Sequence, residues 1–182
     1  MSDTTASTNL DAIPLHQMPG EQVVARWDGT EVLEIRQEAS EALRTIAERV
    51  AVRAMRDTPF HHPAYTVAEA DPETRVYIAR EGGKAVGLAV LRPRTRWGWW
   101  SWDDYDAERR PATGVAPMTS WTVESIWTHA ANQQRGLAKR LLDVAAARLE
   151  QPIESFAWRR PFTPSGEAFV RRHCPEGFWV PD

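Results

Sequence analysis

Short β-prone runs alternate with two amphipathic helical segments along this chain, and this order most constrains its fold. Runs at 22–27 and 31–36 flank Asp28-Gly29-Thr30, and runs at 75–80 and 84–91 flank Glu81-Gly82-Gly83, so each pair predicts an antiparallel hairpin. Apolar residues recur every three or four positions over 39–56 and 136–150, which predicts a helix in each segment. Dense β-branched and aromatic residues predict a strand at 121–128.

The C-terminal part of the chain predicts three further elements. Residues 152–158 are a strand candidate, Thr163-Pro164 is a good start for a helix over about 164–172, and 177–180 form a short last strand. Strands and helices in this order predict an α/β (α+β) fold, a sheet with helices on its faces. Residues 1–20 are rich in Ser, Thr and Asp and are expected to form a flexible leader to a single domain over 21–182.

The composition argues against several kinds of partner and site. Lys and Arg number 22 against 25 Asp and Glu, a net charge of −3 that gives no reason to expect a nucleic acid. No stretch approaches the roughly 20 apolar residues of a membrane span. The single cysteine, Cys174, excludes an internal disulfide and fits a reducing, cytoplasmic setting. His61-His62 lack a partner at ligand spacing, so no metal is expected.

The junction between the strand at 121–128 and the helix at 136–150 carries the clearest functional signal. A helix N-terminus offers unsatisfied backbone N–H groups and a partial positive charge, which suits a phosphate. Gly136 and Ala138 have little or no side chain, so a ligand can approach the main chain closely there. The junction therefore predicts a phosphate-binding loop.

The residues of this junction match a known family. Residues 133–138, Gln-Gln-Arg-Gly-Leu-Ala, have the form Gln/Arg-x-x-Gly-x-Gly/Ala and resemble the acetyl-CoA loop of the GNAT acetyltransferase superfamily. The order of predicted elements over about 32–180 is similar to that of the family. The resemblance implies a central mixed, mostly antiparallel sheet that is flanked by helices and splayed at the acetyl-CoA site. The tail, with residues 160–166 and His173-Cys174, also has some similarity to the cohesin-type acetyltransferases.

The resemblance implies acetyl-CoA as co-substrate and assigns two sets of binding residues. The pyrophosphate loop comprises Gln133, Gln134, Arg135, Gly136, Leu137, Ala138 and Lys139. The edge of the preceding strand, Ile126, Trp127 and Thr128, would pair with the pantetheine arm. Two residues depart from the family pattern, since Thr128 stands where valine is usual, and Arg172 or His173 stands where many members have a tyrosine that protonates the leaving thiolate.

Glu124 is the best-placed candidate for a general base. The reaction that the resemblance implies is attack of a neutral amine on the thioester, and the amine must lose a proton. Burial in an apolar strand would raise the pKa of Glu124 towards that of a base, although a surface glutamate on a half-exposed strand is the plain alternative. Because side chains alternate, Glu124 is expected to share a face with Ile126 and to point away from Val123. His129, at the end of the strand, is the second candidate.

His173 and Cys174 stand at the position of the absent tyrosine. Either could protonate the thiolate, and a helix-end residue that caps or packs is the alternative. A covalent route through Cys174 would need a thiolate of low pKa.

A tryptophan-rich and acidic segment is the candidate acceptor site. Trp100 and Trp102, with Trp97 and Trp99, offer ring faces for a cation, and Asp103 and Asp104 offer opposite charge. Indoles that pack the core, or a contact between two copies of the chain in a homodimer, are the alternative.

These observations predict an N-acetyltransferase that moves acetyl from acetyl-CoA to a primary amine, cationic in character, by direct attack on the thioester. The acceptor would be a small molecule or a peptide. The alternative is a catalytically weak or inactive acyl-CoA-binding or interaction protein on the same fold, because fold does not guarantee activity.

Overall fold

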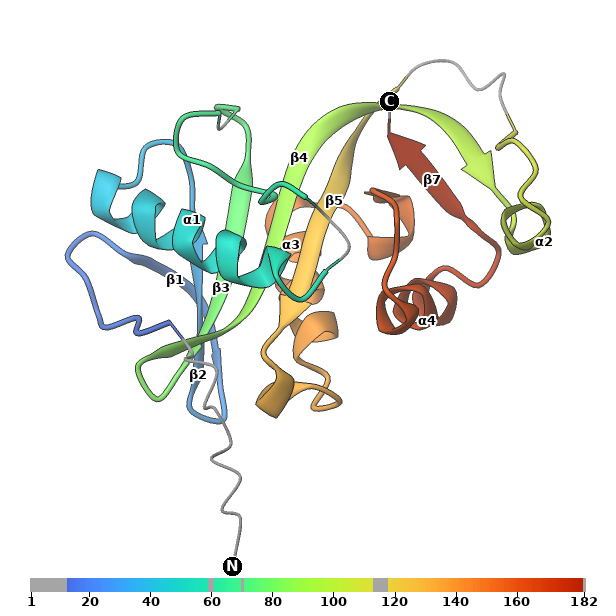
Figure 1. The fold of residues 1–182 in the computed structure, drawn as a ribbon. Helices are drawn as coiled ribbons and strands as arrows, with labels where there is room; N and C mark the ends of the chain where they lie inside the picture. The colour runs from blue at the N-terminus through green and yellow to red at the C-terminus, as the bar shows by residue number, and fades with distance from the viewer. Residues whose placement is uncertain (1–12, 59–60, 70, 113–117, 182) are drawn as a thin grey trace, which may run out of the picture.

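A single bent sheet forms the centre of the protein (Figure 1). The computed structural model describes residues 13–58, 61–69, 71–112 and 118–181. Within them seven strands form one sheet, and two apolar clusters cover its faces. One cluster includes Leu141 and Ala145 of helix α3 (Leu137–Leu149), and the other includes Val50 and Ala54 of helix α1 (Glu41–Met55). The predicted fold class, a mostly antiparallel sheet flanked by helices, is therefore confirmed.

The two predicted hairpins form the N-terminal half of the sheet. Strands β1 (Gln22–Trp27), β2 (Thr30–Ile35), β3 (Arg75–Glu81) and β4 (Lys84–Trp100) are consecutive antiparallel neighbours. Asp28 and Gly29 both have positive φ at the first turn, as do Gly82 and Gly83 at the second. This is the backbone geometry of tight hairpin turns, which is why these short sequences mark them.

Strand β4 is longer than the sequence predicts and divides the sheet into two parts. Its first part pairs with β5 (Met118–Thr128), and its last part arches over to pair with β7 (Phe178–Pro181) (Figure 1). The two-residue strand β6 (Ala157–Trp158) runs parallel to both β5 and β7. Within the predicted strand at 152–158 only Ala157–Trp158 pairs in the sheet, because residues Ile153–Ser155 form a 3₁₀ turn, η2.

Local capping explains where the helices begin. The Ser40 hydroxyl accepts from the Leu43 amide at the start of α1, and the Thr163 hydroxyl accepts from the Gly166 amide at the start of α4 (Pro164–His173). The tryptophan-rich segment ends in a short helix, α2 (Trp102–Asp106), capped by Ser101. Helix α3 differs, because its first residue follows Gly136 with no side-chain cap.

The segment predicted as a flexible leader is in part packed on the sheet. Residues 1–12 lie outside the described residues, but Leu15 is buried and its amide donates to the Gly83 carbonyl at 2.8 Å. The Ala85 amide donates in turn to the Ile13 carbonyl. The prediction of a flexible leader is wrong for Ile13–Leu15, because this apolar stretch packs against the hairpin between β3 and β4 and forms backbone hydrogen bonds with it.

Candidate active site

A β-bulge in β5 positions Glu124. Ser125 pairs with Val90 and Val123 pairs with Leu91, so Glu124 is an extra residue with no partner of its own on β4. The bulge breaks the alternation of side chains, and Val123 and Ile126 consequently pack in the same apolar cluster. Because Val123 and Ile126 lie on one face, Glu124 cannot both share a face with Ile126 and point away from Val123, so this combined expectation is wrong.

Two arginines hold the buried carboxylate of Glu124. The Glu124 side chain has no exposed area, and each of its oxygens accepts a hydrogen bond from a different guanidinium group. Arg94 Nε of β4 donates to Oε1, and Arg159 Nη1, directly after β6, donates to Oε2 at 2.7 Å. The sequence predicted a carboxylate in apolar surroundings, whereas the structure surrounds it with positive charge as well. Neither arginine was singled out from the sequence, because they lie 30 and 35 residues away.

The sheet opens immediately beyond Glu124. Strands β5 and β6 pair only at Thr122 and Val123, and the Arg159 amide makes a last bond to the Val123 carbonyl. Residues Ile126–Thr128 pair with β4 on one side, and on the other side they line a groove. The side chain of Trp127 is buried on the α1 side, where its Nε1 donates to Asp57 at 2.9 Å. Trp127 therefore offers the groove its backbone.

The groove is continuous from Glu124 to the start of α3. Three adjoining cavities, of about 60, 350 and 470 Å³, share wall residues from one to the next. The first and second share Thr58, Ile126, Thr163 and Gly166, and the second and third share Thr128, Gln134, Ala138, Ser165 and Phe169. One wall is β5 and the loop that follows it, and the other is α4.

The loop before α3 lines this groove. Gln134 and Gly136 adopt positive φ values of 62° and 74°. Apart from the two adjoining residues, no atom of the described residues lies within 4 Å of the position that a Cβ on Gly136 would take, so the space beside the loop is open. The first amides of α3 receive no side-chain cap, which leaves them for a ligand. Among the predicted loop residues, Gln134, Gly136, Leu137, Ala138 and Lys139 line the groove here, and Gln133 lines its middle part.

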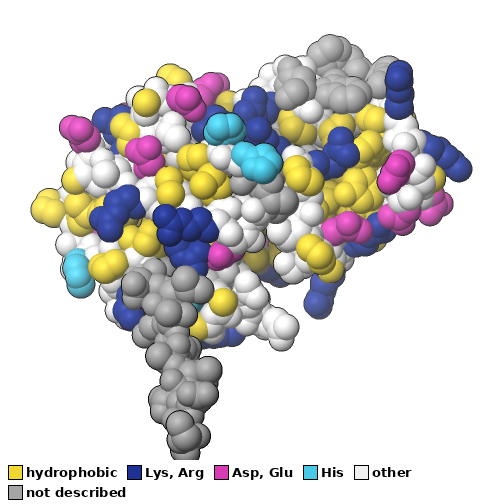
Figure 2. Space-filling view, viewed as in Figure 1, with side chains coloured by type: hydrophobic (Ala, Val, Ile, Leu, Met, Phe, Trp, Pro, Cys, Tyr) yellow, Lys and Arg dark blue, Asp and Glu magenta, His cyan; other side chains and the backbone are white. Residues whose placement is uncertain are grey.

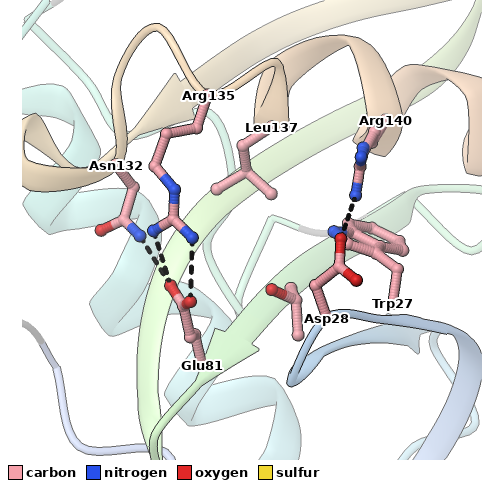
Figure 3. A pocket seen from close by; sticks show the side chains of 8 residues that line it. Trp27, Asp28, Glu81, Asn132, Arg135, Leu137 and Arg140 are labelled. Carbon is pink, nitrogen blue, oxygen red and sulfur yellow. Dashed lines mark hydrogen bonds and ion pairs between the residues drawn. The ribbon is translucent and has the colours of Figure 1, made fainter.

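Glu81, which the sequence analysis overlooked, anchors the loop from behind (Figure 3). Its carboxylate accepts two hydrogen bonds from Arg135, both at 3.2 Å, and one from the Asn132 amide at 2.7 Å. Arg135 lines a neighbouring pocket, which shares Asn132 and Leu137 with the groove and in which Arg140 pairs with Asp28 beside Trp27. A turn glutamate gives no local signal of this role, because the contact spans more than 50 residues.

His173 and Cys174 lie at the end of α4, and the structure separates them. His173 lines the groove near Lys139, and its ring lies 4.5 Å from that of Phe169. Burial, and then the positive charges of Lys139 and Arg172, lower the pKa of His173 below 6.5. Cys174 is buried, and burial raises the pKa of its thiol to about 11, which opposes the covalent route. His129 acts as the N-cap of the 3₁₀ turn η1 (Ala130–Asn132), where its Nδ1 accepts from the Ala131 amide.

The candidate acceptor residues lie outside the groove. Trp100 and Trp102 are buried against Tyr105 and Phe178. Arginines of the chain itself cover their ring faces, with Arg160 3.7 Å from the Trp100 ring centre and Arg171 4.1 Å from that of Trp102.

Their acidic neighbours are engaged locally. The Ser101 hydroxyl caps α2 by accepting from the Asp104 amide and donates to the Asp104 carboxylate, which also pairs with Arg109. Asp103 lies in the first turn of the same helix. The side chain of Trp97 lies outside the described part of the chain.

The visible face of the molecule carries no block of one charge. Basic, acidic and apolar side chains are interspersed on it (Figure 2). Within the described residues no helix has the length and apolar character needed to cross a membrane, and no three His, Cys, Asp or Glu side chains gather in a way that could hold a metal ion.

Sequence comparison links the C-terminal third to one family. Residues 119–180 match the family model described as ESCO1/2 acetyl-transferase. No curated protein matches the sequence. The matched residues include β5, the loop before α3 and the whole of α4, which together build the groove.

Structural comparison extends the likeness to nearly the whole chain. The xEco2 acetyltransferase domain superposes with a TM-score of 0.70 at 18% identity, over 91% of this chain and 98% of that one. The same domain bound to a K105-CoA conjugate gives 0.70 at 19% identity, over 89% and 97%. A ribosomal-protein-alanine N-acetyltransferase from Brucella melitensis biovar Abortus 2308 gives 0.52 at 14% identity, over 80% and 90%. Residues 119–180 thus resemble an acetyltransferase family, and the structural likeness shows the GNAT-like fold that the sequence predicted.

Proposed function

We propose that this protein is an N-acetyltransferase that moves the acetyl group of acetyl-CoA to a primary amine by direct attack on the thioester. The observation that carries the proposal is the continuous groove, which joins uncapped amides at the start of α3 to a buried carboxylate in β5. The solved xEco2 domain bound to a CoA conjugate supports acetyl-CoA as co-substrate. One end of the groove would then bind the CoA portion of acetyl-CoA, and the other end would bind the amine.

The α3 end suits the CoA portion. The backbone amides that follow Gly136 would bind the pyrophosphate, and the aligned peptide dipoles of α3 favour its negative charge. Arg172 on the same walls adds positive charge, whereas the charge of Lys139 is paired with Asp143 at 2.6 Å. The open edge of Ile126–Thr128 would bind the amides of the pantetheine arm, as a further strand binds a sheet edge.

The Glu124 end suits the transfer itself. A neutral amine forms the C–N bond to the acetyl carbonyl carbon, the C–S bond breaks, and CoA leaves as the thiol after it gains a proton. Glu124 would take the proton that the amine gives up, directly or through a water molecule. Because Arg94 and Arg159 cover the carboxylate, this role requires one guanidinium group to move, and Arg159 is the more exposed of the two, at 50% of its side chain against 32%.

His173 remains our proposal for the group that protonates the thiolate. Its position on the groove wall at the end of α4 supports this role. Its lowered pKa sets a condition, because only the protonated imidazole is an effective acid and its population falls as the pH rises through a pKa that lies below 6.5. An acid step through His173 would therefore favour mildly acidic solutions.

The proposed acceptor is a primary amine, which is cationic before it loses its proton. The covered ring faces of Trp100 and Trp102 favour packing over an acceptor clamp for these residues. A cytoplasmic location and a homodimer stay proposals that rest on the sequence, the first on the single cysteine and the second on the tryptophan-rich segment.

The alternative hypothesis, an acyl-CoA-binding protein without turnover, has a specific observation in its favour. The carboxylate of Glu124 is closed to solvent, and no tyrosine stands at the end of α4. Two measurements distinguish the two hypotheses. Calorimetry measures the binding of acetyl-CoA, and a thiol assay then measures the release of free CoA in the presence of a panel of primary amines. Binding followed by amine-dependent release of CoA thiol supports the transferase, whereas binding without thiol release in the presence of any of the amines supports the alternative hypothesis.

A further inference from the structure

Two guanidinium groups from different parts of the chain meet at a single carboxylate at the acceptor end of the groove. Arg94 comes from the middle of β4, and Arg159 stands where the chain leaves β6 towards α4. We propose that Arg159, together with Arg94, binds a carboxylate that the acceptor carries beside its amine, so that the enzyme selects amines with an adjacent anionic group. This inference rests on the proposed function and names its substrate class.

Both arginines keep hydrogen-bond donors that the protein does not use. A guanidinium group has five N–H bonds in a planar fork. Arg94 donates to Glu124 through its Nε, and Arg159 donates to it through one Nη. Within the described residues neither guanidinium group makes a further hydrogen bond. Both side chains are partly exposed. Unused, partly exposed donors in a fork match the geometry of a second carboxylate.

The charge around the pocket also favours an anion. Glu124 supplies one negative charge against the two positive charges of Arg94 and Arg159. Among the described residues that line the pocket at Glu124 there is no other acidic side chain, and Arg159 is the arginine that lines it. The other arginines of β4 are engaged elsewhere, because Arg92 donates to the Ala64 carbonyl and Arg96 stacks on Trp179. The cluster thus carries an uncompensated positive charge that an acceptor carboxylate would neutralise.

Binding of that carboxylate would also uncover the base. Among the described residues, Arg159 is the partner of Glu124 Oε2, whereas Arg94 is the partner of Oε1. When Arg159 turns to the acceptor carboxylate, Oε2 becomes free to receive the amine proton. Arg159 is in this sense a specificity-determining residue, because an acceptor without an anion leaves the base covered.

The test compares acceptors that differ only in one charge. The small-molecule arm uses 4-aminobutyrate and its amide, and the peptide arm uses a lysine followed by aspartate or by asparagine in an otherwise uncharged capped peptide. We expect kcat/KM to be about 10-fold or more higher for the carboxylate member of at least one pair, the loss typical of one charge-assisted hydrogen bond. The arm that shows the preference identifies the source of the anion.

Variants assign the preference to the two arginines. In Arg159→Gln the ratio of the two kcat/KM values should fall to about 1, and Arg94→Gln should reduce it in the same direction. A change in the reactivity of Glu124 would affect both members of a matched pair equally, so it cancels in the ratio of their kcat/KM values. The KM for acetyl-CoA should stay unchanged. Arg109→Gln is the matched control, since Arg109 pairs with Asp104 outside the groove and should leave the ratio at the parental value. A parental ratio in a folded Arg159→Gln protein would overturn the proposal.

A binding arm separates this inference from the proposed function. Calorimetry on protein saturated with CoA measures the affinity of each matched pair without turnover. Charge-selective binding that Arg159→Gln abolishes, with no acetyl transfer, would sustain the anion site and overturn the transferase. Acetyl transfer with equal kcat/KM for both members of both pairs would sustain the transferase and overturn the anion site.

Discussion

Replacing Gly136 with tryptophan distinguishes a phosphate-binding loop from an ordinary helix start. Gly136 has a φ of 74°, where an L-residue is strained, and nothing lies within 4 Å of its missing Cβ. The backbone strain costs about 1–2 kcal/mol. For a chain of this length that corresponds to a decrease in Tm of roughly 2–8 °C, which leaves the protein folded.

The tryptophan side chain would occupy the open space beside the first amides of α3. If it keeps the pyrophosphate from two backbone N–H groups, at about 1.5–3 kcal/mol for each charge-assisted bond, the loss is at least about 3 kcal/mol. The Kd for acetyl-CoA, measured by calorimetry, should then rise by more than about 100-fold.

Gly20→Trp is the matched control for this variant. Gly20 has a φ of 77° and equally open surroundings, but it lies before β1 and away from the groove. It should show a similar decrease in Tm with an unchanged Kd. If folded Gly136→Trp protein binds acetyl-CoA within threefold of the parent, the assignment of the loop is refuted.

Four further predictions test the rest of the site. Glu124→Gln should lower kcat by about 10²–10⁴ with little change in the Kd for acetyl-CoA, and an unchanged kcat would remove Glu124 from the chemistry. Glu81→Gln should raise the KM for acetyl-CoA several-fold at constant kcat, because Arg135 and Asn132 lose the anion that fixes the loop, whereas a decrease in kcat alone would contradict this. If His173 is the acid, kcat should decrease as the pH rises through its lowered pKa, below 6.5, and His173→Gln should abolish that step in the pH profile. Cys174 should react slowly with iodoacetamide at about pH 8 in the folded protein and rapidly in denaturant, because its thiol pKa is raised to about 11, and full activity of Cys174→Ala would exclude an acetyl-cysteine.

The sequence by itself determined the order of elements and the loop. Turn residues with positive φ, such as Gly29 and Gly83, fixed both N-terminal hairpins, and the spacing of apolar residues fixed α1 and α3. The loop at 133–138 was readable for the same reason, because a strand end, a glycine and a helix start are all local signals. These features depend on interactions between residues a few positions apart, and such residues can be identified directly from the sequence.

The tertiary structure alone decided what surrounds Glu124. The bulge depends on how β5 registers against β4, and one extra residue changes which side chains share a face. Arg94, Arg159 and Glu81 act through partners 30 or more residues away, and no spacing in the sequence marks such pairs. Trp100 and Trp102 looked like binding surface because aromatic residues suit both ligands and cores, and only packing against Phe178 and Tyr105 decides between the two. Burial and charge are properties of assembled neighbours, so the chemistry of the carboxylate became visible only once the strands were in place.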